Sequence, residues 1–418
     1  MRKNLIGDQG RLFAELQPSP DEKTFSIDNT SDTYYNSPYF TIHKEQLQAV
    51  PAPRSTPPRM TLDTILGKEV TSAIQKSKKI QFHAVGDTGA AKVKTGPATE
   101  ASVADMMAKD VQTALPDAPA FFLHLGDVIY NFGEGQYYYD QFYEPFRAYD
   151  RPIFAIPGNH DGMVFGDKTD VPKVATLKAF LRNFCAPEPA RSPDAPAMLR
   201  SVMTQPGVYF TLDAPLVSVI GLYSNVLDTF GVISSQGKHY PIGDEQLQFL
   251  QSELTRLKPA RERLERAVIL AVHHPPISAD SKHGGSTGLS KDIDTACQKA
   301  GLWPDAILSG HAHLYQRFTR RLSDREIPYV VSGSGGFAKT RPREGIPPAG
   351  TLVGDHTLEI TPVIEFGYLT VTIDMSGAVP TLTIAFSSPN PQLGTSYDSV
   401  TINLKEKTLF KKPPSPKK

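Results

Sequence analysis

The sequence predicts an α/β fold with four layers, α/β/β/α, in which two mixed sheets are flanked by helices. From about residue 79 onward, apolar runs alternate with helical patterns, and this alternation is typical of βαβ units in a layered sheet. Two further pairs of apolar runs, each joined by a short turn, predict antiparallel hairpins and hence a second sheet. These pairs are Val208–Leu212 with Val217–Leu222, and Tyr368–Ile373 with Thr381–Phe386.

Helices and strands can be told apart by the spacing of their apolar residues. Val103–Leu115 and Gln246–Leu257 carry apolar residues at three- and four-residue intervals, as surface helices do. Five short apolar runs lack this spacing and predict buried strands. They are Ile80–Val85, Ala120–Leu125, Ile153–Ile156, Val268–Val272 and Ala306–Leu308.

Each of these five predicted strands is followed by residues that can hold a metal ion. Loops at the carboxyl ends of strands converge in α/β sheets, so we expect these residues to build one site. In chain order they are Asp87 after the first strand, Asp127 and Tyr130 after the second, Asn159, His160 and Asp161 after the third, His273 and His274 after the fourth, and His311 and His313 after the fifth.

Composition argues against several other classes of protein. The formal net charge is zero, with 44 basic and 44 acidic residues, so we expect no nucleic-acid partner. Two cysteines do not make a disulfide framework. No apolar run reaches the ~20 residues of a membrane helix, and the first residues lack the apolar core of a secretory signal. We therefore expect no membrane partner and a cytoplasmic location, whereas the oligomeric state is not indicated.

The chain divides into three expected parts. Residues 1–78 precede the predicted strands, and prolines interrupt them, so we treat them as an N-terminal extension whose role the sequence does not indicate. Residues 79–403 form the expected catalytic domain. Residues 404–418 are rich in lysine and proline and are expected to be a basic, flexible tail.

The residue types at the strand ends indicate the chemistry of the site. A mixture of Asp, Asn, His and Tyr suits iron, zinc or manganese better than calcium or magnesium. One carboxylate has two oxygens and can bridge two cations about 3.5–4 Å apart, and Asp127 is the natural candidate for this bridge. Two such ions activate water and neutralise phosphate oxygens, which indicates a hydrolase.

Five motifs follow one another within roughly residues 80–317: Asp-x-Gly at 87–89, Gly-Asp-x-x-Tyr at 126–130, Gly-Asn-His-Asp at 158–161, His-x-Pro at 273–275 and Gly-His-x-His at 310–313. In this order they resemble the motifs of the calcineurin-like metallophosphoesterases. Within that family the site is similar to the purple acid phosphatase branch. Gly89 stands where most members place a His, and Tyr130 offers a phenolate in its place. The alternative for Tyr130 is a core tyrosine beside the site.

The resemblance implies a role for each motif residue. One metal ion would be held by Asp87, Tyr130 and His313, the other by Asn159, His273 and His311, with Asp127 as the bridge. The ions would be iron together with a second iron, zinc or manganese. His160 would assist the leaving group, Asp161 would orient His160, and His283 would be a second substrate-facing histidine. The same branch usually has Glu where this chain has Gln316, which is expected to lie outside the metal ligands.

The expected function is that of an acid phosphatase-like enzyme. Hydroxide bound to the metals would attack phosphorus in a small phosphate monoester. A phosphodiester substrate at the same site is the first alternative, and the loops 162–206 and 277–290 would decide between them. A metal-free scaffold with this fold is the remote alternative. The choice of His273 over His274 as ligand is also open at this stage, although the end of the strand at Val272 favours His273.

Overall fold

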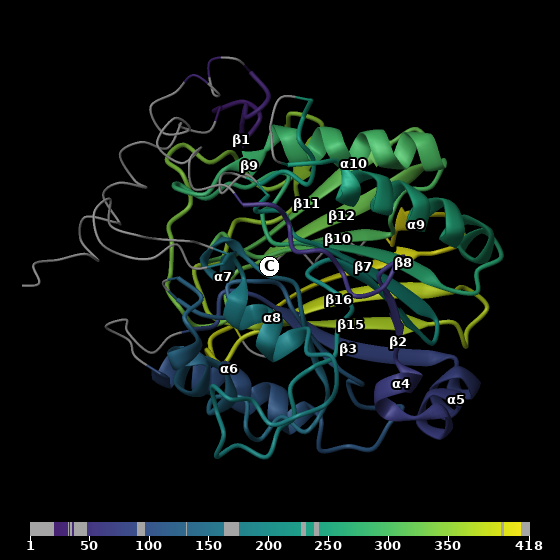
Figure 1. Cartoon of the computed structure of the whole chain (residues 1–418). Coiled ribbons are helices and arrows are strands. Elements are labelled where there is room, and N and C mark those ends of the chain that lie inside the picture. The colour runs from purple at the N-terminus through teal and green to yellow at the C-terminus, as the bar shows by residue number, and fades with distance from the viewer. Residues whose placement is uncertain are drawn as a thin grey trace, which may run out of the picture.

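The computed structural model describes residues 21–31, 33, 36, 48–89, 97–130, 132–162, 175–226, 231–237, 242–393 and 397–410. Over these residues, two large mixed sheets pack together and helices cover their outer faces (Figure 1). The predicted α/β/β/α layering is confirmed. Among the described residues, no helix combines the length and the apolar character that a membrane crossing requires.

The first sheet has seven strands in the order β18-β17-β16-β15-β3-β4-β5. Its strands β3, β4 and β5 run parallel to one another, and the remaining pairs are antiparallel. The predicted C-terminal hairpin is confirmed, because β15 and β16 pair along their whole length. The strands are β3 (Lys79–Val85), β4 (Phe122–His124), β5 (Ile153–Ala155), β15 (Tyr368–Asp374), β16 (Thr381–Ser387), β17 (Asp398–Asn403) and β18 (Thr408–Leu409).

The second sheet has nine strands in the order β13-β14-β11-β12-β10-β8-β7-β6-β2. Strands β7, β8, β10 and β12 are parallel neighbours, while the predicted hairpin of β6 and β7 is antiparallel. The strands are β2 (Arg59–Thr61), β6 (Phe210–Ala214), β7 (Val217–Leu222), β8 (Ala267–Val272), β10 (Ala306–Ser309), β11 (Tyr315–Leu322), β12 (Arg325–Ser332), β13 (Thr351–Val353) and β14 (His356–Leu358).

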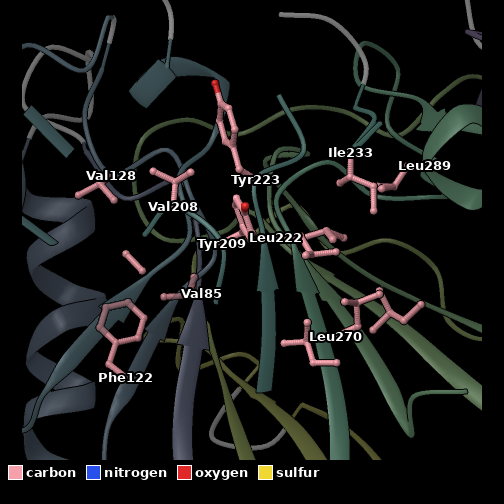
Figure 2. Packing of buried hydrophobic residues seen from close by; sticks show 14 of the residues in the cluster. Val85, Phe122, Val128, Val208, Tyr209, Leu222, Tyr223, Ile233, Leu270 and Leu289 are labelled. Atoms are coloured by element: carbon pink, nitrogen blue, oxygen red, sulfur yellow. The ribbon is translucent and has the colours of Figure 1, made fainter. Parts of the chain in front are cut away.

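The core lies on both faces of the sheets. Successive side chains of a strand point to opposite faces, so Phe82 of β3 packs between the sheets whereas its neighbour His83 faces the other way, toward Asp110 of a covering helix. Phe82 stacks on Phe121 with ring centroids 4.7 Å apart. Figure 2 shows part of the outer-face cluster, to which Val85 also belongs. Burial on both faces explains why these strands read as continuous apolar runs.

The helices differ from prediction mainly at their ends. The helix predicted at Val103–Leu115 overlaps α6 but begins and ends earlier, since α6 spans Pro97–Asp110. The helix predicted at Gln246–Leu257 lies inside the longer α9. The helices are α4 (Asp63–Leu66), α5 (Lys68–Ser77), α6, α7 (Asn159–Gly162), α8 (Lys178–Phe184), α9 (Glu245–Glu262) and α10 (Thr287–Ala300), with a 3₁₀ turn η2 (Gly135–Tyr137) and a π-helical turn η3 (Tyr139–Tyr143).

Parts of the expected N-terminal extension and tail contact the main sheets. Strand β2 pairs in parallel with β6 at the edge of the nine-stranded sheet. A separate two-stranded sheet joins β1 (Ser26–Ile27) to β9 (Gly285–Ser286). Within the expected tail, β18 pairs with β17, and residues 411–418 lie outside the described residues.

Candidate metal centre

Two sets of strand ends meet at one edge of the molecule. Strands β3, β4 and β5 are parallel neighbours in one sheet, and β8 and β10 are parallel neighbours in the other. The chain turns sharply where three of these strands end, because Asp87, Asp127 and His311 have φ angles of 61°, 54° and 69°. Left-handed backbone is costly for residues other than glycine and is concentrated at functional sites. These turns aim the three side chains at a common space.

The first group of donor atoms consists of Asp87, Tyr130 and His313. The Tyr130 hydroxyl donates to Asp87 Oδ1 at 2.9 Å. His313 Nε2 lies 3.3 Å from the same carboxylate oxygen and 3.4 Å from the Tyr130 hydroxyl oxygen. The Asp87 carboxylate oxygen, the Tyr130 hydroxyl oxygen and the His313 imidazole nitrogen thus lie within a few ångströms of one another. Ligands of one metal ion have similar separations.

The second group consists of Asn159, His273 and His311. Asn159 Oδ1 lies 3.1 Å from His273 Nε2 and 3.0 Å from His311 Nδ1. Donor atoms of His273, His311 and Asp127 all lie within 4.8 Å of one another, and the three side chains are buried. The other nitrogen of His273, Nδ1, is 2.8 Å from the carbonyl oxygen of Leu125, which leaves Nε2 free to bind an ion.

Asp127 lies between the two groups. Its Oδ2 accepts from the Tyr130 hydroxyl at 3.0 Å and lies 3.3 Å from His273 Nε2, while its Oδ1 accepts from the backbone N–H of His160 at 2.8 Å. The glycines of two motifs leave room for this carboxylate and for the His273 ring. A Cβ on Gly158 would lie 2.1 Å from Asp127 Oδ1, and one on Gly126 would lie 2.5 Å from His273 Nδ1.

Electrostatics in the site favour a bound cation. Burial, together with the carboxylates of Asp127 and Asp87, raises the pKa of Tyr130 well above its usual value. Burial opposes ionisation of Asp127 too, yet the imidazoles of His273 and His160 hold its pKa below the usual value. Burial disfavours the imidazolium of His273, but Asp127 raises the pKa to about 9.

The donor set therefore fits metal ions. The Tyr130 hydroxyl and His273 Nε2 lie against buried carboxylate oxygens, where bound cations would make the same contacts. A cation would also reverse the shift on Tyr130, because a positive charge beside a phenol favours the phenolate. Imidazole and carboxylate donors together are typical of transition-metal sites.

The described hydrogen bonds of the Asp161 carboxylate go to backbone N–H groups and not to side chains of the metal site. Its carboxylate accepts from the N–H groups of Val128 and Gly158 at 3.1 and 2.9 Å, and from that of Ile129 at 3.2 Å. It thereby joins the loop after β4 to the loop after β5. Burial and the nearby Asp127 raise its pKa to about 7 despite these bonds. That Asp161 also orients His160 stays a prediction.

Three further histidines surround the two groups. The His160 ring lies 4.4 Å from the Tyr130 ring, between centroids, and is half-buried. The His283 ring lies 4.6 Å from that of His311. His274 is buried, and its Nδ1 is 2.8 Å from the hydroxyl of Ser224. His273, not His274, shares the space with Asp127 and Asn159.

The sequence reading missed a sixth strand-end loop, which follows β12. Its backbone supports the first strand end: the N–H of Gly335 donates to Gly86 O, and that of Phe337 donates to Asp87 O, both at 3.0 Å. The Phe337 ring stacks on the Tyr130 ring with centroids 3.4 Å apart. The run Gly-Ser-Gly-Gly at 333–336 was the available signal, but it carries no metal-binding side chain.

The sequence reading also missed Gln141, on the π-helical turn η3. The Tyr130 N–H donates to Gln141 Oε1 at 2.8 Å, and Gln141 Nε2 donates to the Tyr130 carbonyl at 3.0 Å. The side-chain amide therefore holds the backbone of Tyr130 from both sides. π-Helical turns are rare and are enriched at functional sites, yet no local pattern in this sequence marks one.

An α/β/β/α sandwich with carboxylate and imidazole donors paired at its strand ends is typical of a metallohydrolase. Residues 80–315 match the family model for calcineurin-like phosphoesterases, and the chain belongs to that family. This confirms the resemblance drawn from the five motifs. A search of curated proteins returned no match.

Several solved structures are similar to this chain at low sequence identity. The structure of purple acid phosphatase PPD1 from yellow lupin (Lupinus luteus) seeds matches with a TM-score of 0.54 and 14% identity, over 79% of this chain and 54% of that one. This chain thus spans about half the length of the lupin structure. PhoD matches with a TM-score of 0.48 and 13% identity, over 87% and 74% of the two chains. A dimetal phosphatase from Danio rerio matches with a TM-score of 0.45 and 12% identity, over 78% and 99%.

Proposed function

We propose that this protein is a dinuclear metal-dependent phosphatase that hydrolyses phosphate monoesters. The observation that carries the proposal is the position of Asp127, whose Oδ2 lies within 3.3 Å of a donor atom from each of the two groups. One ion would be held by Asp87, Tyr130 and His313, and the other by Asn159, His273 and His311. Two ions in these places would supply Lewis acidity toward phosphoryl oxygens and would lower the pKa of a water molecule to near neutrality.

The environment of Gly89 supports a purple acid phosphatase-like site. A Cβ on Gly89 would lie 2.5 Å from Gln141 Oε1, 2.9 Å from Val128 O and 3.3 Å from Tyr130 Cδ2. A histidine at residue 89 would therefore need the space that the Tyr130 ring and the Gln141 side chain fill. These distances favour Tyr130 as the ligand in place of that histidine.

Charge favours a monoester over a diester. The proposed ligands Asp87, Asp127 and the Tyr130 phenolate carry three negative charges, fewer than the combined charge of a trivalent and a divalent ion. The remaining positive charge suits a phosphate dianion, which a monoester carries and a diester does not. The backbone of His160 is held by Asp127, and in this proposal His160 would give a proton to the leaving oxygen.

The test compares an aryl phosphate monoester with the matching diester on one preparation loaded with iron plus zinc or manganese. We expect the monoester to be hydrolysed faster. Asp127→Asn should abolish turnover and lower the metal content while the circular dichroism spectrum stays unchanged. Asp105→Asn, on the exposed face of α6, is the matched control and should keep full activity. Preference for the diester, or an active Asp127→Asn enzyme, would overturn the proposal.

A further inference from the structure

The loop that connects β8 to α10 carries His283 to the edge of the candidate metal centre. The His283 ring lies 4.6 Å from the His311 ring and 5.3 Å from the His313 ring, between centroids. Residues 275–286 of this loop contribute no proposed metal ligand, and His283 is half-buried. In the proposed phosphatase its ring would therefore contact the substrate and not a metal ion. The position of this ring depends on what holds the loop.

A short N-terminal segment, residues 21–31, lies along this loop. Strand β1 (Ser26–Ile27) pairs in parallel with β9 (Gly285–Ser286), two residues beyond His283. The carbonyl oxygen of Phe25 also accepts from the N–H of Gly285 at 2.9 Å. Figure 1 shows β1 and β9 side by side, above the ends of the large sheets. A two-residue parallel pair is marginal by itself, so a further anchor is needed.

Asn29 supplies that anchor. It is 1% exposed, and its Nδ2 donates to Gly231 O at 3.2 Å and to Ser286 Oγ at 3.0 Å, while its Oδ1 accepts from the N–H of Gly288 at 2.6 Å. Ser286 also caps α10, by accepting from the N–H of Leu289. One buried amide thus joins the N-terminal segment, the loop at residue 231 and the end of the His283 loop.

Asp280 fixes the other side of the same loop. Its Oδ1 accepts from the N–H groups of Lys282 and His283, both at 2.7 Å, and lies 3.4 Å from His283 Nδ1. The Thr340 hydroxyl donates to the other oxygen, and the Thr340 N–H donates to His313 O at 3.1 Å. His283 is therefore held between Asp280 on one side and the residues that Asn29 binds on the other.

We propose that Asn29 is a positioning residue of the catalytic site, which holds the His283 loop so that His283, together with His160, faces the leaving group of the substrate. The inference rests on the proposed phosphatase activity. The N-terminal segment is then a working part of the site, although it lies more than 250 residues from His283 in the sequence. Small displacements of an oriented group cost about 100-fold in rate, so loss of this anchor should be visible in kcat.

The kinetic test uses the full-length, metal-loaded protein and a series of aryl phosphate monoesters with leaving groups of increasing pKa. Asn29→Ala should lower kcat by about 10- to 100-fold with little change in KM, and the loss should grow with the pKa of the leaving group. His283→Ala should show the same dependence, and the double variant should be no worse than His283→Ala. Asp28→Ala is the matched control, because Asp28 is exposed and its carboxylate binds Thr30.

Hydrogen exchange separates this inference from the proposed function. Asn29→Ala should expose the amides of Gly285 and Gly288 to faster exchange, at unchanged metal content, whether or not the wild type hydrolyses the esters. An inactive wild type would refute the phosphatase, and the exchange result would still decide on the anchor. Unchanged exchange, or an equal loss of kcat for all leaving groups, would overturn the proposal. Should Asn29→Ala fail to fold, Asn29→Asp, which keeps the acceptor for Gly288, should show an intermediate loss.

Discussion

Asp292 should make the stability of this protein fall as the pH rises from 4 to 7. This residue lies on α10, is 4% exposed, and accepts from the Ile233 N–H at 3.2 Å, the Ser234 hydroxyl at 2.9 Å and the Gln236 amide at 2.6 Å. Burial, with a further contribution from Asp244, raises its pKa from 3.8 to about 6, against the effect of these hydrogen bonds.

The sign follows from comparing the folded and unfolded chains. Because the pKa is raised on folding, the folded protein binds its proton more tightly, and the unfolded chain ionises first as the pH rises. Stability is therefore highest below the unfolded pKa and is lost between about pH 4 and pH 6. The shift corresponds to about 3 kcal/mol in full, of which about 2–3 kcal/mol falls between pH 4 and pH 7.

Urea unfolding of the wild type and of Asp292→Asn at several pH values measures this effect. The variant does not titrate at residue 292, so its unfolding free energy relative to the wild type should rise by about 2–3 kcal/mol from pH 4 to pH 7. The control Asp105→Asn removes an exposed carboxylate and should stay within about 0.5 kcal/mol of the wild type throughout. A difference between Asp292→Asn and wild type that does not change with pH would refute the reasoning.

Two further substitutions test buried contacts. Gln141→Ala should lower the unfolding free energy by about 2–4 kcal/mol and weaken metal uptake, since the N–H and carbonyl of Tyr130 lose their buried partners; unchanged urea midpoint and metal content would contradict this. Arg261→Ala should lower the free energy of unfolding by about 3–5 kcal/mol in urea, because it leaves the buried carboxylate of Asp305 without its ion-pair partner. The control Arg263→Ala, which removes one partner of an exposed pair, should barely change the urea midpoint.

The strands, and the meeting of the motif residues at their ends, could be predicted because both leave local marks in the sequence. Strand β8 is buried along its whole length, so it reads as an unbroken apolar run that ends where His273 begins. The motif glycines can also be recognised in the sequence, since a Cβ at Gly158 would collide with Asp127 and a Cβ at Gly126 would collide with His273. Strand burial and motif glycines both depend on residues that are close together in the chain, so both can be recognised from the sequence alone.

The ends of helices and the loop after β12 were harder to predict for a physical reason. The helix predicted to reach Leu115 ends at Asp110, because apolar spacing marks the buried face of a helix and not the residue at which the helix ends. The loop at 332–337 acts through backbone N–H and carbonyl groups on Gly86 and Asp87, which every residue type possesses. Side-chain chemistry therefore does not predict these backbone contacts.

Gln316 shows what a departure from the family pattern means once its contacts are known. Its Oε1 accepts from the N–H of Ala279 at 2.7 Å, and its Nε2 donates to the Ser278 hydroxyl at 2.8 Å. A glutamate there would accept the first bond equally, and Ser278 would donate the second by turning its hydroxyl. The exchange of Glu for Gln therefore keeps the geometry of this anchor and removes a buried negative charge. Together with Asp280, it fixes the start of the loop whose far end Asn29 holds, so His283 is positioned by side chains that no metal-binding motif contains.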